Sequence, residues 1–195
     1  MRCEYSNELG ARLLLSAAAK QAMSINSGID PVFAHASRHY IRVYFTLESG
    51  ASKADENLRK IGYINHCGGC GYREGGEQKS LCPRCGAKML SAGPLWIGDL
   101  YSKSMLETAS KFKPNHLKPA DKIVTLALDE CDLPPTYYVV DKVAARLSVA
   151  TPSTNDVINF LKSKGFRAAR TIFNPKGVRT DAQVEDVEEA VSSLK

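Results

Sequence analysis

Four of the chain's six cysteines lie in the stretch HCGGCGYREGGEQKSLCPRCGAKM, residues 66–89, as two C-x-x-C pairs. Each pair, Cys67/Cys70 and Cys82/Cys85, is followed by a glycine, which permits the tight turn that brings two thiolates onto one ion. Four sulfur ligands complete a tetrahedron and leave no open position, so this spacing predicts a structural zinc ion. Between the pairs, YREGGEQKSL predicts a hairpin that turns at residues 75–76 and completes a zinc ribbon.

Other uses of these cysteines fit the pattern less well. A redox C-x-x-C is a single motif at a helix start, and two unrelated surface pairs are the remaining alternative. His66 is a candidate for an alternate metal ligand. The simpler interpretation is that it only lies next to the site in sequence. Cys3 and Cys131 are expected to be small buried apolar residues. Cysteines paired for a metal, and no signal-peptide pattern among the first residues, indicate a reducing, cytoplasmic setting.

Length and charge set broad limits. A chain of 195 residues can form one core with a smaller unit, or two small domains. No apolar run reaches the roughly 20 residues of a membrane helix, so no membrane partner is expected. The net charge of +5 is modest and no basic tail carries it, so the position of the charges matters more than their sum.

The first half of the chain predicts helices and a strand pair. Residues 7–24 read as a largely apolar, buried helix, and VFAHA and HYIRVYFTLES as strands that turn around Ser37 and Arg38. A short helix over ASKADENLRKIG is expected to close at Gly62. GPLWIGD, residues 93–99, is expected to be a turn-rich connector, followed by helices over 102–112 and 120–131 with a two-proline hinge between them.

The last third predicts a helix, a turn, a second helix and a hairpin. VVDKVAARL carries apolar residues at helical spacing. Thr151 is expected to cap the next helix, and Gly165 to end it. FRAARTIF and GVRTDA then read as strands across a turn at residues 174–177, and VEDVEEAVSSL as an acidic terminal helix. This order is that of a winged helix-turn-helix.

From Val157 to Thr180 there is no acidic residue. The same window holds six cations that we assign to nucleic-acid binding: Lys162, Lys164, Arg167, Arg170, Lys176 and Arg179. A local excess of this kind suits phosphate binding, because each neutralised phosphate releases counterions. The alternative is a solvated basic face on a module that packs against protein.

Five features occur in a fixed order: YSNELGARLLL, RHYIRVYF, the two cysteine pairs, GPLWIG, and LKSKGFRAARTIFNPKGVRTDA. Together they closely resemble the C-terminal half of the tRNA guanine-N2 dimethyltransferases of archaea and eukaryotes, over nearly the whole chain. The resemblance implies formation of N2,N2-dimethylguanosine at the junction of the D and anticodon stems, with S-adenosylmethionine as the methyl donor. It also implies a Rossmann-like catalytic domain, a C-terminal tRNA-binding domain, and Cys67, Cys70, Cys82 and Cys85 as zinc ligands.

Two departures from the family's pattern matter. The family's cofactor loop and Asp-Pro catalytic motif lie upstream of the point where this chain starts, so we assign no catalytic residue and expect no methyl transfer by this chain alone. Either the chain is a fragment that lacks an N-terminal domain, or a separate catalytic chain supplies the rest. In the family we expect the sequence R-T-H-F at the position where this chain has Arg170-Thr171-Ile172-Phe173, so the histidine is replaced by Ile172.

The resulting expectation is an α+β chain in three parts. Residues 1–50 would be the terminal helix and strand hairpin of a Rossmann-like methyltransferase sheet, residues 51–100 the zinc ribbon and connector, and residues 101–195 a winged-helix-like tRNA-binding domain. One alternative is a zinc-containing winged-helix DNA-binding regulator, although its second helix offers few base-reading side chains beyond Asn155 and Asn159. The other is a subunit that docks a catalytic partner through the apolar helix near residues 9–23.

Overall fold

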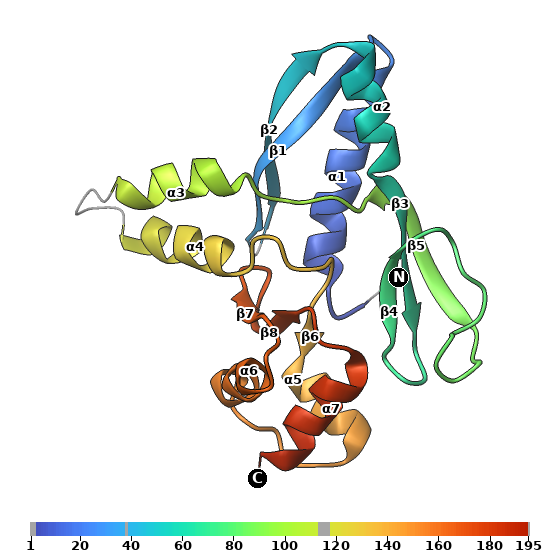
Figure 1. Cartoon of the computed structure of the whole chain (residues 1–195), viewed down its shortest axis with the longest axis vertical. Helices are drawn as coiled ribbons and strands as arrows, with labels where there is room; N and C mark the ends of the chain where they lie inside the picture. Colours follow the sequence, from blue (N-terminus) through green and yellow to red (C-terminus); the bar gives the residue numbers. More distant parts are fainter. Residues whose placement is uncertain (1–2, 38, 113–117, 195) are drawn as a thin grey trace. The chain divides into compact units, whose positions relative to one another are not determined.

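The computed structural model describes residues 3–37, 39–112 and 118–194, which form two compact units. Residues 7–102 make the first unit, and residues 1–6 with 103–195 make the second. Both are mixed α/β units with small sheets: the described strands form one two-stranded and two three-stranded sheets (Figure 1). No helix in this part of the chain is long and apolar enough to cross a membrane.

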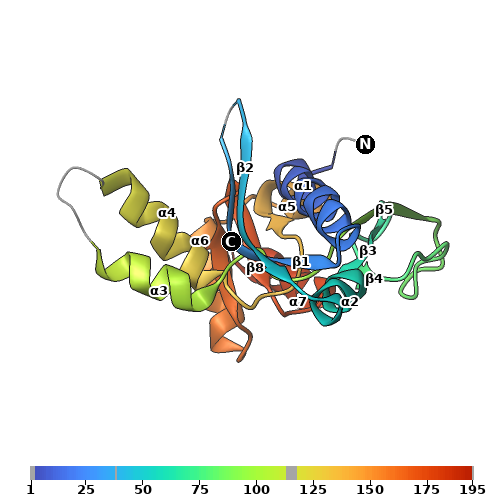
Figure 2. The ribbon, with the colours of Figure 1, turned by 90° about the horizontal axis from the view of Figure 1, so that it is seen from above.

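The first unit begins with the predicted helix and strand pair. α1 covers Ser6–Met23, and β1 (Ser27–Ala36) pairs antiparallel with β2 (Ile41–Ser49) in a long hairpin that stands beside α1 (Figures 1 and 2). Both predictions are confirmed, although Arg38 of the expected turn lies outside the described residues. α1 is only partly buried, since Leu13 and Leu14 are exposed.

A buried ion pair fixes α1 to the end of the second sheet. Glu8 and Arg12, one turn apart, are fully buried and lie 2.8 Å from each other. Arg12 also donates hydrogen bonds to the carbonyl oxygens of Trp96 (3.0 Å) and Gly98 (2.9 Å). The guanidinium therefore meets both a carboxylate and backbone acceptors, as a buried charge requires.

The second sheet of the first unit has the order β4-β3-β5 and follows α2 (Ala51–Arg59). Its strands are β3 (Ile61–Cys67), β4 (Arg73–Gly76) and β5 (Met89–Trp96). Gly62 does not close α2, which is capped by Lys60; it lies in β3, where a Cβ would stand 2.9 Å from the carbonyl oxygen of Gly76. Glycine is therefore required there by the close approach of β4.

Two turn predictions in this region are wrong. Gly75 and Gly76 are strand residues of β4, and the chain reverses instead through the first cysteine pair, between β3 and β4. The first four residues of the expected connector GPLWIGD belong to β5, in which Trp96 is fully buried. A register shift between Gly62 and Ile64 accommodates this stretch in the sheet.

The second unit starts with the helix pair α3 (Lys103–Lys111) and α4 (Lys118–Asp129), side by side in Figures 1 and 2. Both helices were predicted. Of the expected proline hinge, residues 113–117 lie outside the described part, and the rest is the first turn of α4. In α4, Ala127 is buried, whereas Ile123 is 38% exposed.

The remaining elements of the second unit follow the predicted order, except that a short strand, β6 (Tyr138–Val139), which was not predicted, precedes them. They are α5 (Val140–Leu147), α6 (Thr154–Ser163), β7 (Ala168–Thr171), β8 (Asn174–Thr180) and the acidic α7 (Val184–Ser193). The strands form a sheet of order β6-β8-β7. α6 buries Val157, Ile158 and Leu161 and ends before Gly165 at φ +91°, as expected.

Two local predictions in this unit are wrong. Ser153, not Thr151, caps α6, and its hydroxyl accepts a hydrogen bond from the N–H of Asp156 at 3.1 Å. The hairpin reverses at residues 172–173, so the expected turn at 174–177 lies within β8. Gly177 is needed there because a Cβ would stand 2.8 Å from Cδ2 of Tyr137.

Candidate metal centre and nucleic-acid interface

The two C-x-x-C-G segments adopt the same local geometry. In each, the glycine has a positive φ (+76° at Gly71, +71° at Gly86), and its N–H donates to the carbonyl oxygen of the first cysteine at 2.9 Å. The N–H of each first cysteine, Cys67 or Cys82, donates at 2.8 Å to the carbonyl of the residue after the glycine. The predicted role of these glycines is confirmed, because the left-handed conformation favours glycine.

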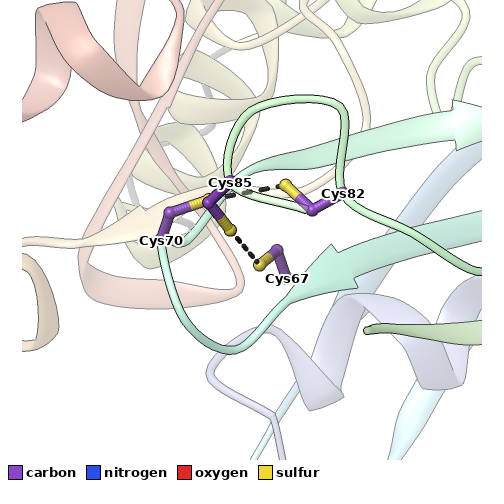
Figure 3. Close-up of side chains that lie close together, drawn as sticks. All are labelled: Cys67, Cys70, Cys82 and Cys85. Atoms are coloured by element: carbon purple, nitrogen blue, oxygen red, sulfur yellow. Dashed lines mark hydrogen bonds between the residues drawn. The ribbon is translucent and has the colours of Figure 1, made fainter. Parts of the chain in front are cut away.

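These two knuckles bring all four sulfur atoms together (Figure 3). The Sγ atoms of Cys67 and Cys85 lie 3.5 Å apart, those of Cys70 and Cys82 3.6 Å apart, and all four lie within 4.8 Å of one another. A tetrahedral zinc ion with Zn–S bonds of about 2.3 Å separates its ligands by about 3.8 Å. The sulfur positions therefore fit this ion, and all six cysteines are free of disulfide bonds.

The electrostatics of the cluster also fit a cation. The backbone N–H of Ala87 lowers the pKa of Cys85, but hydrogen bonds with the other three thiols and burial outweigh it and raise that pKa to about 12. A thiol that is hydrogen-bonded to other thiols holds its proton more firmly than a thiol in water. A divalent cation at this position would reverse that preference, because it binds the thiolate form. His66 lies outside the cluster.

The cysteine-bearing part of the ribbon, residues 66–89, has only a small apolar cluster of its own. Its buried cluster consists of Cys67, Cys82 and Met89, with Cys70 and Tyr72 packed against it. Two of the three buried residues are thus candidate ligands. Arg84 joins the knuckles by donating a hydrogen bond to the carbonyl oxygen of Cys70 at 3.1 Å. So small a core cannot order this segment by apolar burial alone, as is usual for small metal-bound units.

The six predicted RNA-binding cations differ in their surroundings. Three are paired with carboxylates from outside the acid-free window: Lys164 with Glu189 (2.9 Å), Arg167 with Asp181 (2.8 Å) and Lys176 with Asp141. Two have no acidic partner in the described part of the chain: Lys162 and Arg170. The acid-free run of sequence therefore overstates the local positive charge, because α5 and α7 fold acidic residues against it.

Arg179 differs from the other five because it is buried. Its side chain is 2% exposed, and its Nε lies 2.7 Å from Oε2 of Glu130, whose side chain is 0% exposed. Nη1 also donates to the carbonyl oxygen of Pro134 at 3.0 Å. Arg179 cannot reach a phosphate from this position, so its assignment as an RNA contact is corrected. The sequence prediction rested on the charge of Arg179 alone. It could not include Glu130, because that partner lies 49 residues away in sequence.

Asp181 shows how an acid holds one end of the hairpin. Burial disfavours its ionised form, but hydrogen bonds from the Nε and backbone N–H of Arg167, together with the arginine charge, outweigh this and lower the pKa of Asp181. The pair joins the start of β7 to the end of β8. Its partners are 60% and 32% exposed, so it contributes modestly to stability.

A groove of about 600 Å³ lies between the end of α4, α6 and β7. Three of the candidate cations line it: Lys162, Arg167 and Arg170. Asn155 and Asn159 of α6 lie on the same wall. Arg170 of β7 donates from Nε to Oδ1 of Asn155 on α6 (3.0 Å) and from Nη1 to the carbonyl oxygen of Pro175 on β8 (2.7 Å). The groove thus combines cations with neutral hydrogen-bonding groups.

Known proteins resemble this chain along nearly its whole length. A family model described as N2,N2-dimethylguanosine tRNA methyltransferase matches residues 1–192. The tRNA (guanine(26)-N(2))-dimethyltransferase of Methanothermobacter thermautotrophicus is 35% identical over 202 residues, covering 100% of this chain and 53% of the relative. The protein of that name from Pyrococcus abyssi is 34% identical, covering 100% of this chain and 51% of the relative.

One solved structure agrees in fold. It is a complex of Trm1 from Pyrococcus horikoshii with S-adenosyl-L-methionine, 31% identical, with a TM-score of 0.84 over 98% of this chain and 51% of that chain. The chain thus spans about half the length of the curated relatives it matches. In those relatives the unmatched half belongs to the same chain, so the predicted alternative of a separate catalytic chain is not supported.

Proposed function

Because the chain belongs to the N2,N2-dimethylguanosine tRNA methyltransferase family, we propose that it forms the tRNA-recognition part of a tRNA guanine-N2 dimethyltransferase. S-adenosylmethionine would be the methyl donor, the modified guanosine would lie at the junction of the D and anticodon stems, and the setting would be cytoplasmic. The family match over residues 1–192 carries this proposal. The methyl donor's binding groups would belong to the part of the family's length that this chain does not span.

The proposed division of labour follows the three predicted parts. Residues 1–50 would end a Rossmann-like sheet, with α1 and the β1–β2 hairpin as its last elements. Residues 51–100 would be the ribbon and its connector. Residues 101–195 would be a winged-helix-like module, which the order β6, α5, α6, β7, β8 and the sheet order β6-β8-β7 favour.

The four cysteines would hold a structural zinc ion. Cys67 and Cys70 would supply two ligands from the first knuckle, and Cys82 and Cys85 two from the second. Four sulfur ligands leave no position for a water molecule, so the ion would order the ribbon and take no part in methyl transfer. Its binding free energy would replace the apolar core that the ribbon lacks.

The tRNA backbone would be bound by the surface cations of the second unit. Lys162 and Arg170 would contribute most, because neither is paired with a carboxylate in the described part of the chain. Lys164, Arg167 and Lys176 would exchange weak, exposed ion pairs for contacts to phosphate. Arg179 would serve as a buried support of β8 instead.

The experiment that tests this function is a binding comparison across a salt series. Bulk tRNA and random duplex DNA are titrated separately against the full chain, with zinc present. The proposal expects tighter binding of tRNA than of DNA, and an affinity for tRNA that falls steeply with salt. Tighter binding of duplex DNA would favour the alternative of a DNA-binding regulator. Equal, weak binding to both would contradict tRNA recognition by this part of the family's length.

A further inference from the structure

We propose that the groove between α4, α6 and β7 binds one unstacked nucleotide of the RNA, with its base against α6 and its phosphate at the groove's cations. This inference rests on the proposed function and adds a site at which sequence can be read. Proteins recognise RNA sequence mostly through unstacked bases, because the edges of bases in A-form duplexes are hard to reach. A volume of about 600 Å³ lies within the range of roughly 300–1,000 Å³ for sites that hold small ligands.

The charge distribution favours a phosphate in this groove over other places on the same surface. Lys162 is exposed and makes no ion pair with any described residue, and Arg170 is held by neutral acceptors, Asn155 and the carbonyl of Pro175. No carboxylate of the described residues pairs with either of them, whereas Lys164 and Lys176, which do not line the groove, and Arg167, which does, are paired with carboxylates. Among the lining residues, Asp129 alone is acidic.

Two amides on α6 provide the means to read a base. Asn155 and Asn159 lie one turn apart, so both side chains project from the same face of the helix. The carbonyl oxygen of Asn155 accepts from Arg170, which leaves its NH₂ group to donate. Asn159 has no hydrogen-bond partner among the described residues, so its amide offers a donor and an acceptor together. That pair matches the paired donor and acceptor on the edge of a base.

The walls of the groove suit the flat faces of a base. Its lining includes Ile158 and Ala169, which are largely buried, and the half-buried ring of Phe166. Apolar and aromatic surfaces stabilise an unstacked base through stacking and burial. Cations, amides and apolar walls thus occur together in one groove, as a nucleotide with its charged and flat parts requires.

The test uses the full chain, bulk tRNA and three variants. Asn159→Ala removes the amide without changing charge, and we expect it to weaken tRNA binding roughly tenfold while leaving the dependence on salt unchanged. Lys162→Ala is expected to weaken binding and to reduce the slope of log K against log salt by about 0.7–0.9. Lys142→Ala, which removes an exposed lysine of α5 outside the groove, is the matched control and should change neither.

The outcomes separate this inference from the function on which it rests. If the wild-type chain binds tRNA and neither groove variant weakens binding, the inference is wrong and the proposed function stands. If the wild-type chain does not bind tRNA, both are wrong. Circular dichroism confirms that each variant is folded, and all three substituted side chains are exposed. As a second readout, adenosine, guanosine, cytidine and uridine 5′-monophosphates should shift the side-chain amide resonances of Asn155 and Asn159.

Discussion

Removal of Arg179 should unfold the second unit more easily without removing an RNA contact. Arg179→Ala leaves the carboxylate of Glu130, 0% exposed, without the guanidinium that lies 2.7 Å away. Breaking a buried pair by removing one partner costs about 3–5 kcal/mol, because an uncompensated charge stays buried. With a denaturant slope of about 2 kcal/mol/M, the urea midpoint should fall by about 2 M.

The assay combines urea unfolding with tRNA binding on the same samples. Lys176→Ala is the matched control for the unfolding measurement alone, because Lys176 is 61% exposed and its ion pair with Asp141 should contribute little to stability. A double variant, Arg179→Met with Glu130→Gln, removes the buried charge and keeps an oxygen that can accept from the N–H of Ile172. We therefore expect it to recover much of the lost stability.

The two roles of Arg179 predict opposite results. A structural role predicts that Arg179→Ala lowers stability and that, under conditions where it is still folded, it binds tRNA as the wild type does. An RNA contact predicts wild-type stability and weaker binding. The second result would refute the argument from burial and restore Arg179 to the RNA-binding set.

Further predictions test the metal centre, the helix cap and one acid. Cys82→Ser should abolish zinc binding, measured as metal content, and should disorder the ribbon, measured by circular dichroism. Cys3→Ser, outside the cluster, should retain the zinc ion and the ordered ribbon. Ser153→Ala should lower the free energy of unfolding by about 0.5–2 kcal/mol, whereas Thr151→Ala should leave it nearly unchanged; equal effects would contradict the assigned cap. Because its pKa is lowered when folded, Asp181 stabilises the protein above its ordinary pKa of 3.8, and this is lost as the pH falls further. Urea unfolding of Asp181→Asn should therefore show a shallower loss of stability in acid; an unchanged profile would contradict the shift.

Local sequence signals predicted the helices and the metal cluster because the information is local. Helical periodicity lies within each helix, and each C-x-x-C-G segment forms its own turn through hydrogen bonds over a few residues. The same signals failed where a glycine has a tertiary reason. Gly62 and Gly177 resemble a helix end and a turn, yet each permits close approach of a neighbour from elsewhere in the chain.

Strong turn residues inside strands account for the misplaced hairpin. Asn174-Pro175 is a turn signal in isolation, and the side chain of Asn174 does accept from the N–H of Lys176 at 2.9 Å. In the folded unit, this local bend lies within β8, where the pairing with β7 shifts register between Arg170 and Thr171. Proline is tolerated at such an irregularity because the ladder lacks a regular hydrogen bond there.

The net charge around the candidate RNA-binding cations could not be predicted from residues 157–180 alone. Counting charges between residues 157 and 180 omits the acids that α5 and α7 bring to the same surface. It also omits Glu130, the buried carboxylate that pairs with Arg179. The groove depends on α4 as well as on α6 and β7. Each of these facts is a property of tertiary packing between distant segments.

The hairpin of β1 and β2 has a practical consequence for handling this protein. Since β2 pairs with β1 alone among the described strands, its other edge carries backbone donors and acceptors available to another strand. Leu47 and Tyr44 on this strand are 60% and 47% exposed. A long, apolar, open edge is a template for intermolecular pairing. We therefore expect concentrated solutions of this chain to self-associate through β2, and Leu47→Lys to suppress that aggregation.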